Sequence, residues 1–566
     1  MTESKKTRWY KDAVIYQIYP RSFVDSDGDG IGDIRGIISK LDYIKDLGAT
    51  AVWLSPCYKS PNDDNGYDIS DYRDIMDEFG TLDDWKEMLA GLHERGIKLL
   101  MDLVVNHTSD EHEWFKQSRS SVDNPYRDYY FWRKGRGKDG KKPPNNWTSR
   151  FGGSAWEYDA ATGEWYLHLF TKKQPDLNWD NPKVRKEVHD LVAYWLDLGV
   201  DGFRCDVITY ISKVAGLPNG RFNPIICGDE MFTHGPHIHE YLSALNTEVI
   251  SRYDAMTVGE AAGVTIEQGL LYTAESRGEL DMVFEFEHIL SEAYFSIFPK
   301  KFNLKQYKAI MSKWQDGMRG KGWNSLYLEN HDQPRALGRC TGNYGGNRKE
   351  ASKMLAVALN MLQGTPYIYQ GQEIGMTNCD FAPDEYQDVM VKTIFGIVKK
   401  YVPFLKPIAL KIMKEKARDN ARTPMQWDAS ENAGFTTGAP WLKINPNHTE
   451  INVAEAEKDP DSILNFYKKL NRFRVGNEIV KLGSYRQFDR KNKNVYCYER
   501  VLDGKKLLVV CNFKNAEIPF APPECCAGLP SSVVLHNYPD ARSLTPFTLK
   551  PYEAVVFEVE LRNSGF

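Results

Sequence analysis

Acidic side chains follow several apolar segments of the sequence that are predicted to be buried strands. Asp206 lies in "VDGFRCDVI" (200–208), Glu260 in "YDAMTVGEA" (253–261) and Asp332 in "GWNSLYLENHD" (322–332). If these strands are parallel and close into one barrel, the three carboxyl groups converge on one rim. Neighbouring carboxylates repel, so one of them tends to keep a proton. An ionised carboxylate beside a protonated one supplies the nucleophile and the acid that glycoside hydrolysis requires.

A second group of carboxylates lies in the loop "DSDGDGIGDIRG" (25–36). Its acidic residues at every second position, followed by Gly30, match the first half of a calcium-binding EF-hand loop. The match ends at the twelfth position, where Gly36 replaces the bidentate Glu, so the EF-hand interpretation is rejected. A polar surface loop without a metal is one alternative. The other is a site for one hard cation, with the carboxylates of Asp25, Asp27, Asp29 and Asp33 and the carbonyl of Ile31 as ligands.

These side chains need a scaffold that joins distant segments, and predicted strands alternate with amphipathic helices along the chain. A helix is predicted over 34–48, and another is predicted to begin after Thr81 and end at Gly96. The segment 184–196 places its apolar residues on one helical face. This alternation is typical of a parallel sheet with right-handed crossovers, and eight such units form a (β/α)8 barrel, an α/β fold. The predicted strands lie in 13–19, 50–56, 97–107, 200–208, 253–261, 322–332 and 364–373.

Two segments break this alternation and divide the chain into domains. The segment 104–173 is irregular and rich in Trp, Gly, Asn and Lys, and it is too long for a simple loop. We therefore predict a small domain inserted after the third strand. The segment 483–566 contains short alternating strands, which predict a C-terminal antiparallel β-sandwich. The barrel would then comprise 1–103 and 174–482.

The overall composition excludes several classes of protein. The 566 residues carry a net charge of −5 without a basic cluster, so we expect no nucleic-acid partner. We find neither a leader segment nor an apolar stretch approaching the roughly 18 residues of a membrane helix, so no membrane partner is expected. The nine cysteines are odd in number, and Cys525 and Cys526 are adjacent. This pattern favours reduced thiols and a cytoplasmic location. The oligomeric state cannot be predicted from the sequence.

Five motifs resemble, in order and spacing, the signature regions of the α-amylase superfamily, glycoside hydrolase family 13. They are "DLVVNH" (102–107), "QPDLNWD" (174–180), "DGFRCDVI" (201–208), "MTVGE" (256–260) and "LENHDQPR" (328–335). Two further stretches, "GYDISDY" (66–72) and "ARTPMQWD" (421–428), resemble the subgroup of oligo-1,6-glucosidases, α-glucosidases and dextran glucosidases. The resemblance implies a TIM barrel and a retaining, exo-acting enzyme that hydrolyses terminal α-glucosidic bonds of short oligosaccharides.

The resemblance also implies roles for individual residues. Asp206 is expected to be the nucleophile, Glu260 the acid/base, and Asp332 the carboxylate that holds ring hydroxyls. Arg204 is expected to keep Asp206 ionised. The metal loop resembles a structural Ca²⁺ site with no part in catalysis. The other expected substrate contacts are His107 and His331, the pair of Asp68 and Arg422 on the terminal 4-hydroxyl, and the pocket residues Tyr67, Phe151, Phe170 and Gln174.

The resemblance is less specific about which bond is cleaved. Val207, directly after the nucleophile, resembles the residue that accompanies α-1,6 preference in the subgroup. Two departures from the subgroup's pattern oppose a simple transfer of the α-1,6 preference to this chain. Cys205 replaces a bulkier apolar residue, and the segment 283–298 differs from the usual continuation after the acid/base. An α-1,4-glucosidase and a sucrose-hydrolysing or transglucosylating enzyme therefore stay open as alternatives. A sucrose isomerase is disfavoured because the segment 335–350 lacks the "RLDRD" loop. For a trehalose-6-phosphate hydrolase, the sequence shows no clear cluster of phosphate-binding residues. The intact triad disfavours a non-catalytic scaffold.

Overall fold

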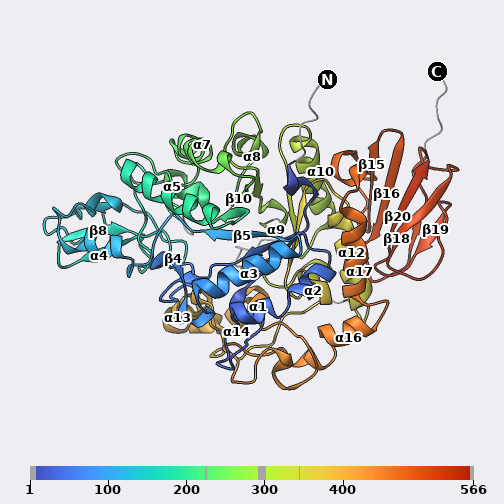
Figure 1. The fold of residues 1–566 in the computed structure, drawn as a ribbon, viewed down its shortest axis with the longest axis horizontal. Helices are drawn as coiled ribbons and strands as arrows, with labels where there is room; N and C mark the ends of the chain where they lie inside the picture. Colours follow the sequence, from blue (N-terminus) through green and yellow to red (C-terminus); the bar gives the residue numbers. More distant parts are fainter. Residues whose placement is uncertain (1–7, 224–225, 291–300, 343, 561–566) are drawn as a thin grey trace.

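The centre of the molecule is an eight-stranded, all-parallel sheet. The computed structural model describes residues 8–223, 226–290, 301–342 and 344–560. The strand order is β11-β10-β9-β5-β2-β1-β13-β12, and a parallel bridge between Val283 and Asn324 joins the two end strands. The predicted (β/α)8 barrel is therefore confirmed (Figure 1). Its strands are β1 (Ile15–Ile18), β2 (Ala51–Leu54), β5 (Lys98–Leu103), β9 (Gly202–Cys205), β10 (Met256–Glu260), β11 (Met282–Phe284), β12 (Ser325–Tyr327) and β13 (Thr365–Tyr369).

Helices surround this sheet, and their ends follow the sequence signals. Thr81 caps α3 in a capping box with Asp84, and Gly96 follows the helix with a positive φ of 68°. The predicted apolar face of α5 is buried, with Trp195 fully inside. The longer helices are α3 (Leu82–Glu94), α4 (Glu113–Ser120), α5 (Pro182–Asp197), α7 (Ile238–Glu248), α8 (Ile266–Thr273), α10 (Leu304–Met318), α12 (Arg348–Asn360), α13 (Val389–Tyr401), α14 (Lys406–Lys416) and α17 (Ile463–Arg474).

The helix predicted over 34–48 is divided in the structure. It forms α1 (Ile34–Ile38) and α2 (Leu41–Asp46), with Lys40 outside helical geometry between them. The hydroxyl of Ser39 donates to the carbonyl of Gly36 at 2.6 Å, which offers the backbone a local alternative to the helical ladder. Gly36 is required because a Cβ there would lie 2.1 Å from the carbonyl oxygen of Val24. This contact holds α1 against the loop that contains the clustered aspartates.

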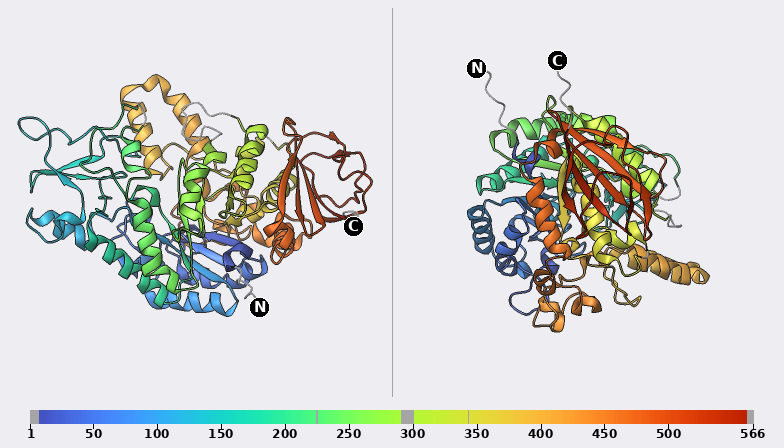
Figure 2. Two further views of the ribbon diagram at one scale, coloured as in Figure 1. Left: turned by 90° about the horizontal axis from the view of Figure 1, so that it is seen from above. Right: turned by 90° about the vertical axis from the view of Figure 1, so that its right-hand side faces the viewer.

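The segment 104–173 contains a small sheet of its own. Its strands β6 (Trp132–Arg133), β8 (Glu164–Leu167) and β7 (Trp156–Asp159) pair antiparallel in that order. An aromatic core that includes Trp147, Trp156 and Phe232 packs beside it. This sheet and the C-terminal sheet lie at opposite ends of the molecule, with the barrel between them (Figures 1 and 2). The elements agree with an inserted domain; its exact boundaries stay predictions.

The C-terminal part forms the predicted antiparallel β-structure. One sheet has the strand order β14-β15-β16-β20-β18, and β17 pairs with β19 beside it. Lys308 of α10 anchors this part to the barrel by donating to the carbonyls of Asp489, Asn492 and Val495 at 2.9–3.1 Å. The strands are β14 (Ser484–Phe488), β15 (Val495–Leu502), β16 (Lys505–Asn512), β17 (Ile518–Phe520), β18 (Ser531–His536), β19 (Phe547–Leu549) and β20 (Ala554–Glu560).

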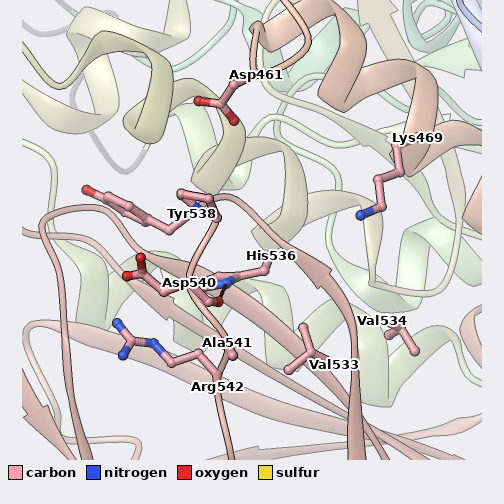
Figure 3. A pocket seen from close by; sticks show the side chains of 10 residues that line it. Asp461, Lys469, Val533, Val534, His536, Tyr538, Asp540, Ala541 and Arg542 are labelled. Atoms are coloured by element: carbon pink, nitrogen blue, oxygen red, sulfur yellow. Dashed lines mark hydrogen bonds between the residues drawn. The ribbon is translucent and has the colours of Figure 1, made fainter.

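A pocket of about 320 Å³ lies between α17 and the C-terminal sheet (Figure 3). Lys469 of α17 and Val533, His536, Tyr538 and Arg542 of the C-terminal part line it. Arg542 is engaged by the buried carboxylate of Glu553 at 2.6 and 2.8 Å, and His536 contacts the same carboxylate at 2.9 Å. The pocket contains none of the predicted catalytic residues. Within the described ranges, no helix combines the length and the apolar character needed to cross a bilayer.

Candidate active site

Arg204 lies at the centre of the converging carboxylates. It is on β9, its side chain is 2% exposed, and it contacts three acidic groups. Its Nη1 donates to Asp102 Oδ1 at 2.8 Å and to Asp206 Oδ1 at 2.6 Å, and its Nη2 donates to Glu260 Oε2. Parallel register places Asp102 of β5 opposite Arg204. One guanidinium therefore holds the predicted nucleophile and the predicted acid/base side by side.

The ionisation of Asp206 differs from the prediction. Burial raises the pKa of Asp206 well above its ordinary value of 3.8; Arg204 opposes this, while the charges of Glu260 and Asp102 add to it. Arg204 is thus in the predicted place but does not by itself keep the nucleophile ionised. The reason is that a single cation faces three carboxyl groups in a site with little solvent.

Asp332 has the opposite electrostatic environment. Its Oδ1 accepts from Arg422 Nη2 at 2.7 Å and from Arg418 Nη1 at 3.4 Å, and its Oδ2 lies 3.1 Å from His331 Nε2. Burial alone would raise the pKa of Asp332, but His331, Arg422 and Arg418 together hold it well below its usual range. These three cations therefore favour the ionised form of Asp332.

His331 is fixed by a stack of aromatic rings at the base of the site. Its ring lies parallel to that of Tyr67, with centroids 5.4 Å apart, and to that of Tyr19 at 6.0 Å. Its Nε2 is 2.6 Å from the Tyr67 hydroxyl and its Nδ1 is 2.8 Å from Gln17 Nε2. The Tyr67 hydroxyl also donates to Asp102 at 3.2 Å. Tyr67 and His331 are thus both part of the site, as predicted.

Val207 has a strained backbone next to Asp206. Its φ of 34° and ψ of 37° lie in the left-handed region, which β-branched residues rarely adopt. This conformation places its N–H 3.3 Å from Glu260 Oε2. Its side chain packs against the aromatic core of the inserted segment. Strain of this kind costs of order 1–3 kcal/mol and is typical of functional sites. Val207 therefore follows one predicted catalytic carboxylate in the chain and contacts the other through its N–H.

The remaining predicted pocket residues form one wall. His107 Nε2 lies 3.2 Å from Gln174 Nε2 and 3.2 Å from the Tyr67 carbonyl. Burial lowers the pKa of His107 to about 4, so this imidazole is neutral. Phe170 packs on His107 with ring centroids 5.1 Å apart, and Phe151 contacts Phe170 edge-on at 5.6 Å. The structure brings these four residues together, as the sequence predicted.

The structure corrects the predicted partner of Asp68. It was predicted to pair with Arg422, but its carboxylate accepts from Ser60 Oγ at 3.0 Å and from the N–H groups of Asp63 and Asp64 at 2.8 and 2.9 Å. It is fully buried and stabilises the turn 60–68. Such short-range hydrogen bonds are the usual role of Asp in a turn. The predicted pairing of Asp68 with Arg422 is therefore wrong, and its contact with a 4-hydroxyl stays a prediction.

Asp64 occupies the position expected for Asp68. Its Oδ1 lies 3.6 Å from Arg418 Nη2, and its Oδ2 accepts from Gln174 Nε2 at 3.2 Å. In the described part of the chain, Asp64 Oδ1 and Arg422 Nη1 are buried without a hydrogen-bond partner. Buried polar atoms usually have partners, so these two atoms have free capacity for a hydrogen bond with a ligand. Neither Asp64 nor Arg418 was predicted from the sequence as a site residue. The available signal for Arg418 was its spacing of four residues from Arg422, which places both side chains on one face of a helical turn.

Replacing Asp64 is expected to weaken substrate binding. If the chain hydrolyses isomaltose, as the resemblance implies, Asp64→Asn should lower kcat/KM about 10- to 100-fold, because hydrogen bonds to charged groups contribute about 1.5–3 kcal/mol. Asp68→Asn should instead lower the melting temperature, with a smaller loss of activity. Steady-state kinetics and thermal unfolding of the two variants compare these roles. A large activity loss with Asp68→Asn and none with Asp64→Asn would restore the original assignment.

The aspartate loop gathers three of its predicted ligands. Asp25, Asp27 and Asp29 each place a carboxylate oxygen within 4.8 Å of the others. Asp33 lies outside this group: it caps α1 by accepting from Gly36 N at 2.6 Å and also accepts from Ser26. Ile31 donates its N–H to Asp29 at 2.7 Å. Three carboxylate oxygens are hard ligands that suit Ca²⁺, so the donor set fits the predicted cation even without Asp33.

The unusual segment 283–298 is described only as far as 290. Within it, Glu285 binds His288 Nδ1, and His288 Nε2 lies 3.0 Å from the carbonyl of Tyr327. Both residues are buried, and His288 links the segment to the carbonyl of Tyr327 at the end of β12. Residues 291–298 lie outside the described residues. Cys205, the other departure, is buried on β9.

Comparisons with known proteins identify the family of the chain. The family model described as "Alpha amylase, catalytic domain" matches residues 17–483. Oligo-1,6-glucosidases of Parageobacillus thermoglucosidasius and Bacillus cereus are 55% and 53% identical over 564 residues, covering 98% of this chain and 99% and 100% of theirs. The crystal structure of a mutant trehalose-6-phosphate hydrolase of Bacillus licheniformis superposes with a TM-score of 0.93 at 46% identity, covering 98% of this chain and 100% of that one.

Proposed function

The chain belongs to the alpha-amylase family of glycoside hydrolases, and from this premise we propose that it is a retaining, exo-acting α-glucosidase. It hydrolyses terminal α-glucosidic bonds of short oligosaccharides and prefers the α-1,6 bond. The observation that carries the proposal is the shared contact of Asp206 and Glu260 with Arg204, opposite an ionised Asp332. This arrangement offers a nucleophile and an acid/base to one anomeric carbon.

The reaction follows from the positions of these groups. Asp206 attacks the anomeric carbon while Glu260 gives its proton to the departing glycosidic oxygen, so one C–O bond forms as another breaks. Glu260, now a carboxylate, then removes a proton from water, and this water displaces Asp206 with the original configuration restored. Asp332, held by Arg422 and His331, accepts hydrogen bonds from ring hydroxyls and favours the distorted ring of the transition state.

The polar end of the site supports exo-action. Asp64, Arg418 and Arg422 lie together, and Asp388 fixes Arg418 by a 2.9 Å ion pair. A charged, closed end of this kind suits the hydroxyls of a terminal sugar, since hydrogen bonds to charged groups are strong and directional. A chain that continued beyond that sugar would have to displace these ion pairs. The pocket therefore favours short substrates bound by their non-reducing end.

The preference for α-1,6 bonds is expected to depend on Val207. Initial rates on isomaltose, maltose and sucrose, with glucose and fructose measured separately, should be highest for isomaltose. Val207→Thr should shift the ratio of kcat/KM towards maltose by about tenfold, because exchanging one γ-methyl group for a hydroxyl group in a pocket is worth about 1–3 kcal/mol. Faster hydrolysis of maltose or sucrose by the wild type would favour the alternatives, an α-1,4-glucosidase or a sucrose-hydrolysing or transglucosylating enzyme.

We also propose a structural Ca²⁺ held by Asp25, Asp27 and Asp29, with the carbonyl of Ile31. This loop contacts the segment near Thr436, whose hydroxyl donates to Asp25, and so connects two distant parts of the barrel. Glycosyl transfer between Asp206 and water needs no Lewis acid, so the ion has no catalytic step. The nine free cysteines support a cytoplasmic location for the enzyme.

Removal of the cation is expected to lower stability rather than turnover. Chelation should lower the melting temperature by several degrees, since a ligand that binds only the folded state stabilises it, while the initial rate stays unchanged. Asp27→Asn should abolish the effect of added Ca²⁺ on melting, and the exposed Asp123→Asn serves as its control. Immediate loss of turnover on chelation, before any unfolding, would contradict a purely structural ion.

A further inference from the structure

Two adjacent thiols lie beside two cations on the C-terminal sheet. The Sγ atoms of Cys525 and Cys526 are 3.8 Å apart. Arg486 Nη2 donates to Cys525 Sγ at 3.0 Å, and Lys506 Nζ lies 3.9 Å from Cys525 Sγ and 3.6 Å from Cys526 Sγ. Cysteine reacts as the thiolate, which neighbouring Arg and Lys stabilise. These contacts therefore distinguish the pair from an ordinary surface thiol.

A buried carboxylate fixes both cations beneath the sulfur atoms. Glu499 of β15 has a side chain only 7% exposed. It accepts from Arg486 Nε of β14 at 2.7 Å and lies 2.8 Å from Lys506 Nζ of β16. Because β14, β15 and β16 are neighbouring strands, the sheet itself sets the positions of these three side chains. The cationic surroundings of the thiols are thus built into the sheet.

Cys525 differs from Cys526 and from the other seven cysteines in its exposure. Cys525 is the only exposed cysteine, and all nine lie in described residues. Burial raises the pKa of Cys526 to about 11, against the effect of Lys506. Burial likewise raises the pKa of Cys379 to about 11, and that of Cys57 further. An accessible thiol next to a protected one is typical of an attacking and a resolving cysteine.

We propose that Cys525 and Cys526 form a dithiol site that undergoes thiol–disulfide exchange with low-molecular-weight disulfides. The Cys525 thiolate attacks one sulfur of the disulfide RSSR, which forms a mixed disulfide and releases RS⁻. Cys526 then gives up its proton and attacks Cys525 Sγ, which releases the second RS⁻. The protein loses two electrons and two protons, and RSSR becomes two RSH.

The product is a disulfide between adjacent residues, and such a bond is strained. Cα atoms joined by a trans peptide are about 3.8 Å apart, whereas ordinary disulfides span about 4.4–6.8 Å. Strained disulfides are readily reduced, so the site is reversible in a reducing compartment.

A divalent metal is the competing ligand, and the structure disfavours it. Glu499 and the two thiols have ligand atoms within 4.8 Å of one another, a set that suits Zn²⁺. The oxygens of Glu499, however, are engaged by Arg486 and Lys506. A metal ion would have to displace both cations or bind against their charge. In thiol–disulfide exchange, by contrast, the same two cations stabilise the attacking thiolate.

Intact-mass analysis of the full chain tests the exchange. After incubation with oxidised glutathione, the wild type should lose two hydrogens and carry no adduct, and mild reduction should reverse this. Cys526→Ser and Cys526→Ala should retain one glutathione on the peptide that contains Cys525. Cys525→Ser should show neither product. Adducts on other cysteines, or a retained adduct on the wild type, would overturn the proposal. Tight binding of Zn²⁺ by the reduced wild type that blocks the exchange would also overturn it.

The role of Arg486 is tested by the rate of alkylation. Arg486→Gln should slow the reaction of Cys525 with iodoacetamide near neutral pH, because it removes the cation that lies 3.0 Å from the sulfur atom. Arg490→Gln, an exposed substitution in the same part of the chain, should leave the rate unchanged. Both variants should keep full glucosidase activity. An unchanged alkylation rate in Arg486→Gln would contradict the proposed electrostatic role.

Discussion

Replacing Asp206 by Asn is expected to lower kcat/KM for isomaltose by at least about 10⁴-fold, in the range that removal of a covalent nucleophile costs. The amide is nearly isosteric and can still contact Arg204, but it cannot form the glycosyl ester. Binding of substrate should therefore persist while turnover stops. Steady-state rates and equilibrium binding of isomaltose to the inactive enzyme measure the two effects separately.

The same substitution should leave the protein as stable as the wild type or more stable. The folded-state pKa of Asp206 is raised, so the stability that its protonated form contributes is present at low pH and is lost as the pH rises through that pKa. Above that pKa the charged group destabilises the fold relative to its protonated form, and Asn removes this contribution. Asp190→Asn on the exposed side of α5 is the matched control. A lowered melting temperature with Asp206→Asn would contradict this electrostatic account.

The raised pKa also sets the acid limb of activity. The wild-type kcat/KM should fall as the pH decreases through the pKa of Asp206 in the free enzyme, with a midpoint above 3.8. Arg204 lowers the pKa of Asp206 and therefore keeps the acid limb of the pH profile from lying at a still higher pH.

The second large effect is expected for Glu260→Gln, and it should depend on the leaving group. For isomaltose the loss should be about 10²- to 10⁴-fold, the usual contribution of general acid–base catalysis. For α-glucosyl fluoride, whose leaving group needs no proton, the first step should be nearly unaffected. Glu267→Gln, exposed on α8, is the control. Equal losses on the two substrates would remove Glu260 from the acid role.

Much of the fold was predictable because strand and helix signals are local. Thr81 and Gly96 mark the ends of α3 as predicted, and the apolar face of α5 is buried. The break between α1 and α2 was not predictable from periodicity, since it depends on Ser39 and on the contact of Gly36 with Val24. Propensity describes a helix well until a tertiary contact interrupts it.

The candidate site was predictable where residues end barrel strands and less so in the loops. Asp206 and Glu260 converge because parallel strands place their ends at one rim. Asp64 and Asp68 lie four residues apart in one turn, and only the turn's own hydrogen bonds decide which carboxylate faces Arg418. The backbone strain at Val207 and the raised pKa of Asp206 depend on all the groups that surround them in the fold, and a linear motif does not contain these groups.

The most direct test of the central claim combines the two predictions. Glu260→Gln enzyme mixed with α-glucosyl fluoride should accumulate a covalent glucosyl ester, because the first step proceeds and the water-activating base is missing. Intact mass should rise by one glucosyl unit, and peptide mapping should place it on Asp206. Release of fluoride with β-glucose as the first product and no ester on Asp206 would mean inversion, and would contradict the assignment of Asp206 as nucleophile.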